Sequence, residues 1–231
     1  MAAPNEHEAA ERVVASSEQE LIAAVEAADA AGVELRIGAS PQADEGFSGR
    51  LIQVTSRGLT LTDDGCEADS LAYCGGMLVT VGAGMSWPEF VALAVESEWV
   101  GVERLAWYQG SVAGATIANV HAYGQSVSDT IAAVRTYDRV ARELRRFAMV
   151  YCEFERAGSR FSRERMPDGS PRYVLLDIAF LFVQGDLTEQ VKDPGLADLL
   201  NVELWQRATL RRTRDAVLEA MREQDAPPGP R

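Results

Sequence analysis

The sequence predicts a two-lobed α+β fold, and three observations lead to it. The chain has 231 residues, of which 47% are hydrophobic, so it is long and apolar enough to bury a core. A helical pattern followed by a strand opens the chain, which is typical of a small α/β lobe. Short strand patterns then continue to the longest β-branched and aromatic run, Tyr173 to Val183, and two helical patterns follow it.

The first helix is predicted from its capping residue and its apolar spacing. Ser16 or Ser17 can cap a helix that runs to about Ala31, with apolar residues at helical spacing and Gly32 after its end. Residues 33–37 then read as a strand. We therefore expect disordered tails at 1–12 and 224–231, an N-terminal α/β lobe over 13–84 and a second α+β lobe over 85–223.

The other elements follow from turn signals and alternation. Ser86 to Glu89 has a capping-box pattern with proline in the first turn, which predicts a helix to about Ser97. Alternating apolar residues predict strands between the turns. The expected strands lie near 50–54, 57–62, 70–74, 77–82, 130–138, 142–150 and 173–183, and the last two helices near 194–200 and 206–223.

Charge and cysteine content limit the partners and the compartment. The net charge is −13, from 22 basic and 35 acidic residues, which argues against a nucleic acid or an anionic membrane as partner. No basic and apolar leader and no apolar run of about 20 residues is visible. Cys66, Cys74 and Cys152 form no paired motif, so we expect a reduced, cytoplasmic setting and no metal site. Nothing in the sequence indicates an oligomeric state.

The segment from Trp99 to Gln125 is the most informative part of the chain. Gly110 and Gly114 bracket three small residues, and Asn119, Tyr123 and Gly124 follow within ten residues. Glycine allows a ligand to approach the backbone closely and leaves N–H groups free to meet an anion. Ordinary turns would explain any single glycine, but the whole run predicts a surface formed by backbone.

These motifs resemble the flavin-binding core of the UDP-N-acetylenolpyruvoylglucosamine reductases, within the FAD-linked oxidase fold. Residues 101–103, 110–112, 119–120 and 122–125 match that family in order and spacing, whereas Gln109 replaces a proline and His121 a glycine. The resemblance implies FAD as cofactor and a two-lobed FAD-binding fold. It places the cofactor-binding residues at Gly38, Ser40, Gly110, Ser111, Val112, Asn119, Tyr123 and Gly124.

An earlier loop resembles the part of that family that holds the FAD pyrophosphate. Gly38-Ala39-Ser40 is similar to its glycine-rich start, and residues 44–49 match its Asp-x-Gly-Phe-x-Gly end. The connection is about two residues short, and Pro41 removes an amide donor. We therefore expect a weakened phosphate site in this loop.

Three candidate catalytic residues follow from the same resemblance. Arg156 falls on the family's active-site arginine, whose planar fork suits a carboxylate, although a surface arginine in a charged loop is an equal alternative. His121 could serve as an acid or base near neutral pH, or could be structural. We expect His121, Arg156 and Ser159 to approach one cleft.

The resemblance also implies a limit. Family members continue into a third domain that supplies the proton-donating serine, a glutamate and much of the UDP site, and we expect that domain to be lacking here. The peptidoglycan reaction itself is therefore not expected. Three hypotheses stay open: an FAD-dependent oxidoreductase for a small-molecule substrate, a flavin-free cyclase or isomerase, and a non-catalytic binding protein.

Overall fold

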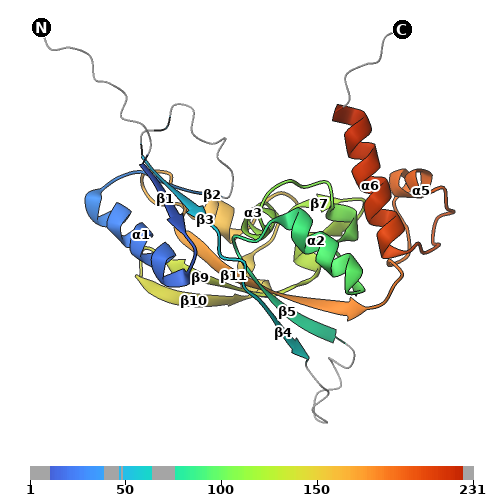
Figure 1. The fold of residues 1–231 in the computed structure, drawn as a ribbon, viewed down its shortest axis with the longest axis horizontal. Helices are drawn as coiled ribbons and strands as arrows, with labels where there is room; N and C mark the ends of the chain where they lie inside the picture. The colour runs from blue at the N-terminus through green and yellow to red at the C-terminus, as the bar shows by residue number, and fades with distance from the viewer. Residues whose placement is uncertain (1–10, 39–46, 48, 64–75, 226–231) are drawn as a thin grey trace, which may run out of the picture.

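The protein forms two lobes built on separate β-sheets. A computed structural model describes residues 11–38, 47, 49–63 and 76–225 (Figure 1). The first lobe is a parallel sheet in the order β1-β3-β2, with helix α1 packed on it. Its elements are β1 (Glu11–Ala15), α1 (Glu18–Ala31), β2 (Leu35–Gly38) and β3 (Arg50–Val54).

The second lobe is an antiparallel sheet in the order β10-β9-β11-β5-β4, with β6 paired to the end of β11. Helices α2 and α3 lie beside it, and α5 and α6 lie at the far end from the first lobe (Figure 1). Its strands are β4 (Leu59–Asp63), β5 (Gly76–Gly82), β6 (Trp99–Val100), β9 (Ile131–Asp138), β10 (Glu143–Ala148) and β11 (Tyr173–Gln184). Its helices are α2 (Trp87–Glu96), α3 (Val112–Ala118), α4 (Arg160–Arg163), α5 (Pro194–Leu200) and α6 (Leu210–Asp225), and β7 (His121–Ala122) and β8 (Gln125–Ser126) form a small hairpin.

The predicted α+β fold is confirmed, and the two helices with predicted capping residues begin at those residues, whereas α6 begins four residues later than expected. Ser17 accepts a hydrogen bond from the amide of Glu20 at the start of α1, and Gly32 ends the helix at a φ of 64°. At α2, Ser86 is the capping residue, but its side chain makes no capping hydrogen bond. The predicted capping box is therefore not formed there.

Three features of the fold differ from the expected elements. Strand β1 begins at Glu11, inside the expected disordered tail, because it pairs in parallel with β3. Strands β4 and β5, expected in the N-terminal lobe, belong to the second sheet because β5 pairs along β11. Helix α3 has no counterpart among the predicted elements. The expected strand at 70–74 lies outside the described residues.

Two apolar cores hold the lobes. The larger one is rich in aromatic side chains, and Trp87, Phe90, Phe180 and Phe182 stack or tilt against one another at centroid distances of 4.8–6.5 Å. The smaller core lies under α1 and joins both lobes, because Tyr137, Val174 and Leu176 of the second sheet pack into it. Three polar contacts to α1 flank this smaller core, and they are made by Arg135 and Tyr137 of β9 and by Arg139 directly after β9. We call these contacts the α1 clamp.

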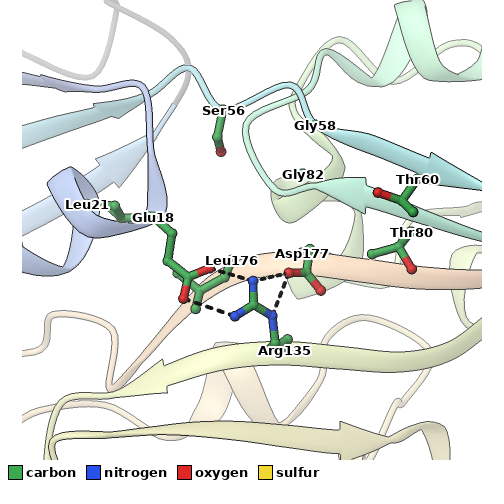
Figure 2. Close-up of a pocket in the computed structure, with 10 residues that line it drawn as sticks. All are labelled: Glu18, Leu21, Ser56, Gly58, Thr60, Thr80, Gly82, Arg135, Leu176 and Asp177. Carbon is green, nitrogen blue, oxygen red and sulfur yellow. Dashed lines mark hydrogen bonds and ion pairs between the residues drawn. The ribbon is translucent and has the colours of Figure 1, made fainter.

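The α1 clamp uses alternate residues, two in β9 and the third directly after its end, and alternate residues of a strand face the same side of the sheet. Arg135 donates to both carboxylate oxygens of Glu18, at 3.0 and 2.5 Å, and to Asp177 at 2.6 Å. Figure 2 shows its guanidinium between these two carboxylates. The Tyr137 hydroxyl donates to Glu26 at 2.7 Å, and Arg139 donates to Asp29 at 2.5 Å. The clamp thus fixes α1, and with it the first lobe, on the second sheet.

A close backbone contact adds a second junction between the lobes. Gly84 follows β5, and a Cβ atom added to it would lie 2.6 Å from the carbonyl oxygen of Val54 in β3. That distance is well inside van der Waals contact and involves backbone on both sides. Only glycine allows the two segments to approach this closely.

The clamp predicts a pH-dependent contribution from Tyr137. Burial, together with the hydrogen bond to Glu26, raises the pKa of Tyr137 from 10.0 to about 12. The unfolded chain then loses the phenol proton at a lower pH than the folded chain, so the free energy of unfolding falls as the pH rises from 10 toward 12. Tyr137→Phe should lower it by about 1–2 kcal/mol at neutral pH through loss of the hydrogen bond. This deficit should shrink as the pH rises above 10.

Urea unfolding at neutral and alkaline pH measures the deficit. Tyr151, which is 64% exposed, provides the matched control Tyr151→Phe, for which we expect no deficit at either pH. A Tyr137→Phe deficit of the same size at both pH values would contradict the assignment.

The Gly84 contact predicts that Gly84→Ala destabilises the protein by about 1–3 kcal/mol, because the added methyl group overlaps the backbone of Val54. Gly58→Ala is the matched control, since a Cβ atom at Gly58 meets nothing within 4 Å. Thermal unfolding of the two variants should therefore separate them. Equal melting temperatures would show that the β3 backbone yields at this contact.

Candidate functional site

A cleft of about 540 Å³ lies between the two lobes. Its volume is within the range of small-molecule sites. One wall comes from β2, β3 and the residues after β3. The other comes from the segment before α2, from α3 and the residues before it, and from the start of β11. The lining residues are Ile37, Gly38, Gln53–Thr55, Arg57, Ala83, Gly84, Ser86, Tyr108–Ser111, Ala113, Gly114, Ile117, Pro171 and Tyr173–Leu175.

Backbone dominates the wall at the start of α3. Ser111 caps this helix, and its Oγ accepts from the amide of Gly114 at 3.1 Å. The amides of Val112 and Ala113 donate to the carbonyls of Met85 and Ala83. Among the described residues nothing accepts from the amides of Gly110 and Ser111, and both residues line the cleft. The cleft therefore offers an anion two backbone donors without side-chain charge.

The charge of the lining differs from that of the whole protein. The chain carries 35 acidic residues, yet no carboxylate is among the described residues that line the cleft. The cation of the lining is Arg57, which is exposed and lies 3.4 Å from Glu89 of α2. The cleft is thus the part of an acidic protein that suits an anion.

The predicted cofactor-binding residues separate into groups. Gly38, Gly110 and Ser111 line the cleft, whereas Val112 is fully buried in the larger core behind it. Asn119 is also buried, and its amide donates to the carbonyl of Glu155 at 2.7 Å while its side-chain oxygen accepts from Ser128. Ser40 lies outside the described residues.

Tyr123 and Gly124 lie away from the cleft lining. Both have positive φ, at 50° and 73°, and Gly124 lines a second cavity of about 490 Å³. The carbonyl of Tyr123 accepts from Arg104, which lines the same cavity and is buried. These two residues therefore shape the loop between β7 and β8.

The predicted catalytic residues come from neighbouring loops that Asn119 connects. His121 is exposed on β7, with Nδ1 3.4 Å from the carbonyl of Asn119. Arg156 is exposed in the turn between Glu155 and Gly158. Ser159 is fully buried and donates its hydroxyl to the carbonyl of Ile117 at 2.8 Å. None of the three lines the cleft among the described residues, and the geometry gives the Ser159 hydroxyl a structural partner.

Sequence reasoning missed several residues of the cleft. Ser86 has a sequence signal as the cap of a helix, and Gly84 lies in the Gly-x-Gly segment before it, but neither signal marks a ligand site. Tyr108 and the tryptophans at 87, 99 and 107 could line an apolar pocket or pack in the core, and of these four Tyr108 lines the cleft. Residues 53–55 and 173–175 enter the site only through the pairing of distant strands.

The cleft fits the FAD that the resemblance implies. The glycines at 84, 110 and 114 have no side chain to cover the backbone. The two amides without an acceptor belong to residues of the lining, and Ser86 and Ser111 add hydroxyl groups to it. These are the groups with which a protein meets a nucleotide phosphate. Elsewhere in the described residues, no group of three His, Cys, Asp or Glu side chains could hold a metal ion. No helix there is long and apolar enough to cross a membrane.

Known proteins resemble the chain over most of its length. It is 38% identical to the UDP-N-acetylenolpyruvoylglucosamine reductase of Cutibacterium acnes over 210 residues, 89% of this chain and 52% of that protein. It is 37% identical to the enzyme of the same name from Thermobifida fusca, over 90% of this chain and 55% of that protein. The chain thus spans about half the length of these reductases.

Solved structures share the fold. UDP-N-acetylenolpyruvylglucosamine reductase from Thermus caldophilus aligns with a TM-score of 0.56 at 17% identity, over 94% of this chain and 64% of that one. Cholesterol oxidase from Brevibacterium sterolicum aligns with a TM-score of 0.50 at 14% identity, over 76% and 34%. A family model described as FAD binding domain matches residues 9–144. The chain therefore belongs to the FAD binding domain family.

Proposed function

We propose that the chain binds FAD in the cleft between its lobes and serves as an FAD-linked oxidoreductase for a small-molecule substrate. The observation that carries the proposal is the glycine-walled cleft with two free amides and no described carboxylate, in a chain of net charge −13. Family membership and the names of the relatives support the same cofactor and the same class of reaction.

The residues of the cleft have distinct roles in this proposal. The amides of Gly110 and Ser111 hold the anionic phosphates, and Gly84 gives them room to approach the backbone. The apolar part of the walls comes from Ile37 of β2, Val54 of β3 and the buried residues Tyr173–Leu175 of β11. When bound, FAD supplies the redox chemistry, while the protein supplies position and electrostatics.

We assign the catalytic candidates by their exposure. Arg156 is free to pair with a substrate carboxylate through its planar fork, and His121 is free to move a proton near neutral pH. Ser159 holds the loop that carries Arg156, through its bond to Ile117. The resemblance assigns the proton-donating serine of the reductases to a further domain, and Ser159, engaged and fully buried, does not replace it. We therefore propose that the described residues do not by themselves run the reaction that names the reductases.

The absorbance of the purified protein tests the proposal. We expect the visible band of an oxidised flavin, or its appearance after reconstitution with FAD, at about one FAD per chain. Protein that stays colourless after purification and after incubation with FAD would rule out the flavin function.

A pair of Ser111 variants locates FAD in the cleft. Asp and Asn both cap helices well, so Ser111→Asp and Ser111→Asn should each preserve α3. Only Asp adds a negative charge beside the free amides, and it should weaken FAD binding about tenfold or more relative to Asn. Titration with FAD, followed by flavin fluorescence, measures both affinities. Equal affinities of the two variants would place the phosphates elsewhere.

A further inference from the structure

Tyr108 occupies the part of the cleft where α3 exposes its backbone. It is half-buried, and its ring meets that of Trp107 edge to face at a centroid distance of 6.0 Å. Its hydroxyl reaches over Gly110 and Gly114, which lie about one helical turn apart. The phenol is therefore part of the wall that a bound anion would meet.

The glycine geometry shows how close this contact is. A Cβ atom at Gly110 would lie 2.3 Å from the Tyr108 Oη, and one at Gly114 would lie 2.5 Å from it. The phenol thus takes the space that the missing side chains leave. A ligand oxygen that accepts from an amide lies about 2.7–3.2 Å from the amide nitrogen, and it also needs room for its own van der Waals radius. The same space cannot hold the phenol and a ligand group.

The phenol is held there without polar partners. Among the described residues nothing hydrogen-bonds to the Tyr108 hydroxyl, and burial raises the pKa of the phenol. No hydrogen bond to a described residue therefore has to break when the ring turns out of the cleft, and the phenol is retained there by packing alone. Trp107, beside it, is 37% exposed, so solvent is close.

We propose that Tyr108 determines the affinity of the cleft: its phenol covers Gly110 and Gly114 in the empty protein and is displaced when FAD binds. This inference rests on the proposed FAD function. Since FAD then binds only the fraction of molecules in which the phenol has turned away, its apparent affinity is lower by that fraction. Tyr108 acts as a steric competitor rather than as a donor to the phosphates.

Two variants separate the steric role from hydrogen bonding. Tyr108→Ala removes the ring and should bind FAD about tenfold more tightly than the wild type. Tyr108→Phe keeps the ring and removes the hydroxyl, so its affinity should equal that of the wild type. The measurement is equilibrium dialysis against FAD, which needs no turnover. Weaker or unchanged binding by Tyr108→Ala overturns the proposal, as does weaker binding by Tyr108→Phe, which would make the hydroxyl a donor to FAD.

Tryptophan fluorescence of the wild type gives a test without a Tyr108 variant. Displacement of the phenol should change the emission of Trp107 when ADP, which does not fluoresce, is added. This change should be absent in Trp107→Phe. ADP binding by dialysis without a Trp107 signal would overturn the displacement. If wild type and Tyr108→Ala both fail to bind FAD and ADP, the proposed function fails together with this inference. If the wild type binds and Tyr108→Ala binds equally well, only the inference fails.

Discussion

The α1 clamp is the interaction on which the site depends, because it fixes the distance between the two walls of the cleft. Arg139 is almost fully buried and pairs with Asp29, so its charge is neutralised by a partner of low exposure. A pair of this kind is costly to break from one side, since the remaining charge would stay buried. Arg135 is one-third exposed. Its ion pairs with Glu18 and Asp177 therefore contribute more to the position of α1 than to the free energy of unfolding. Without α1 in place, the contact of Val54 with Gly84 and the packing of β3 in the smaller core would have to hold β2 and β3 on the second sheet.

In the second wall, some backbone amides donate hydrogen bonds within the protein and others have no acceptor among the described residues. Two hydrogen bonds flank the Ser86–Ser111 bridge. The amide of Val112 donates to the carbonyl of Met85, and the amide of Trp87 donates to the carbonyl of Gly110. This bridge ties the entries of α2 and α3 together. The bonds from Val112 to Met85 and from Ala113 to Ala83 use the first helical amides for the fold. The amides of Gly110 and Ser111 have no acceptor among the described residues, and both residues line the cleft. The binding surface therefore consists of the amides that are left unpaired once α3 is bonded to the segment before α2.

Sequence patterns predicted the elements that depend on local chemistry and missed those that depend on distant pairing. Gly32, Ser17 and the proline of α2 mark boundaries by conformational preference, and the structure has these boundaries. Strand β1 carries no such mark, because it exists through β3, which lies 39 residues further along the chain. At the site, Gly110 and Ser111 could be found from their own motif. Val54 and Gly84 could not, because their roles come from close approach between segments, whereas for Tyr108 the sequence left a pocket wall and core packing both open.

The most recognisable motif of the chain does two separate jobs. Residues 110, 111, 113 and 114 line the cleft, whereas none of the residues 119–125 does. Gln125 accepts from the amide of Arg104 and donates to Glu103, and Glu103 is fully buried and accepts from the amide of Gly101. A buried carboxylate needs such partners to remain in the core. The Tyr-Gly-Gln part of the motif therefore belongs to a buried polar network. The presence of this part of the motif is compatible with any occupant of the cleft. The identity of that occupant depends instead on the few residues at the start of α3 and on Tyr108, which lies against them.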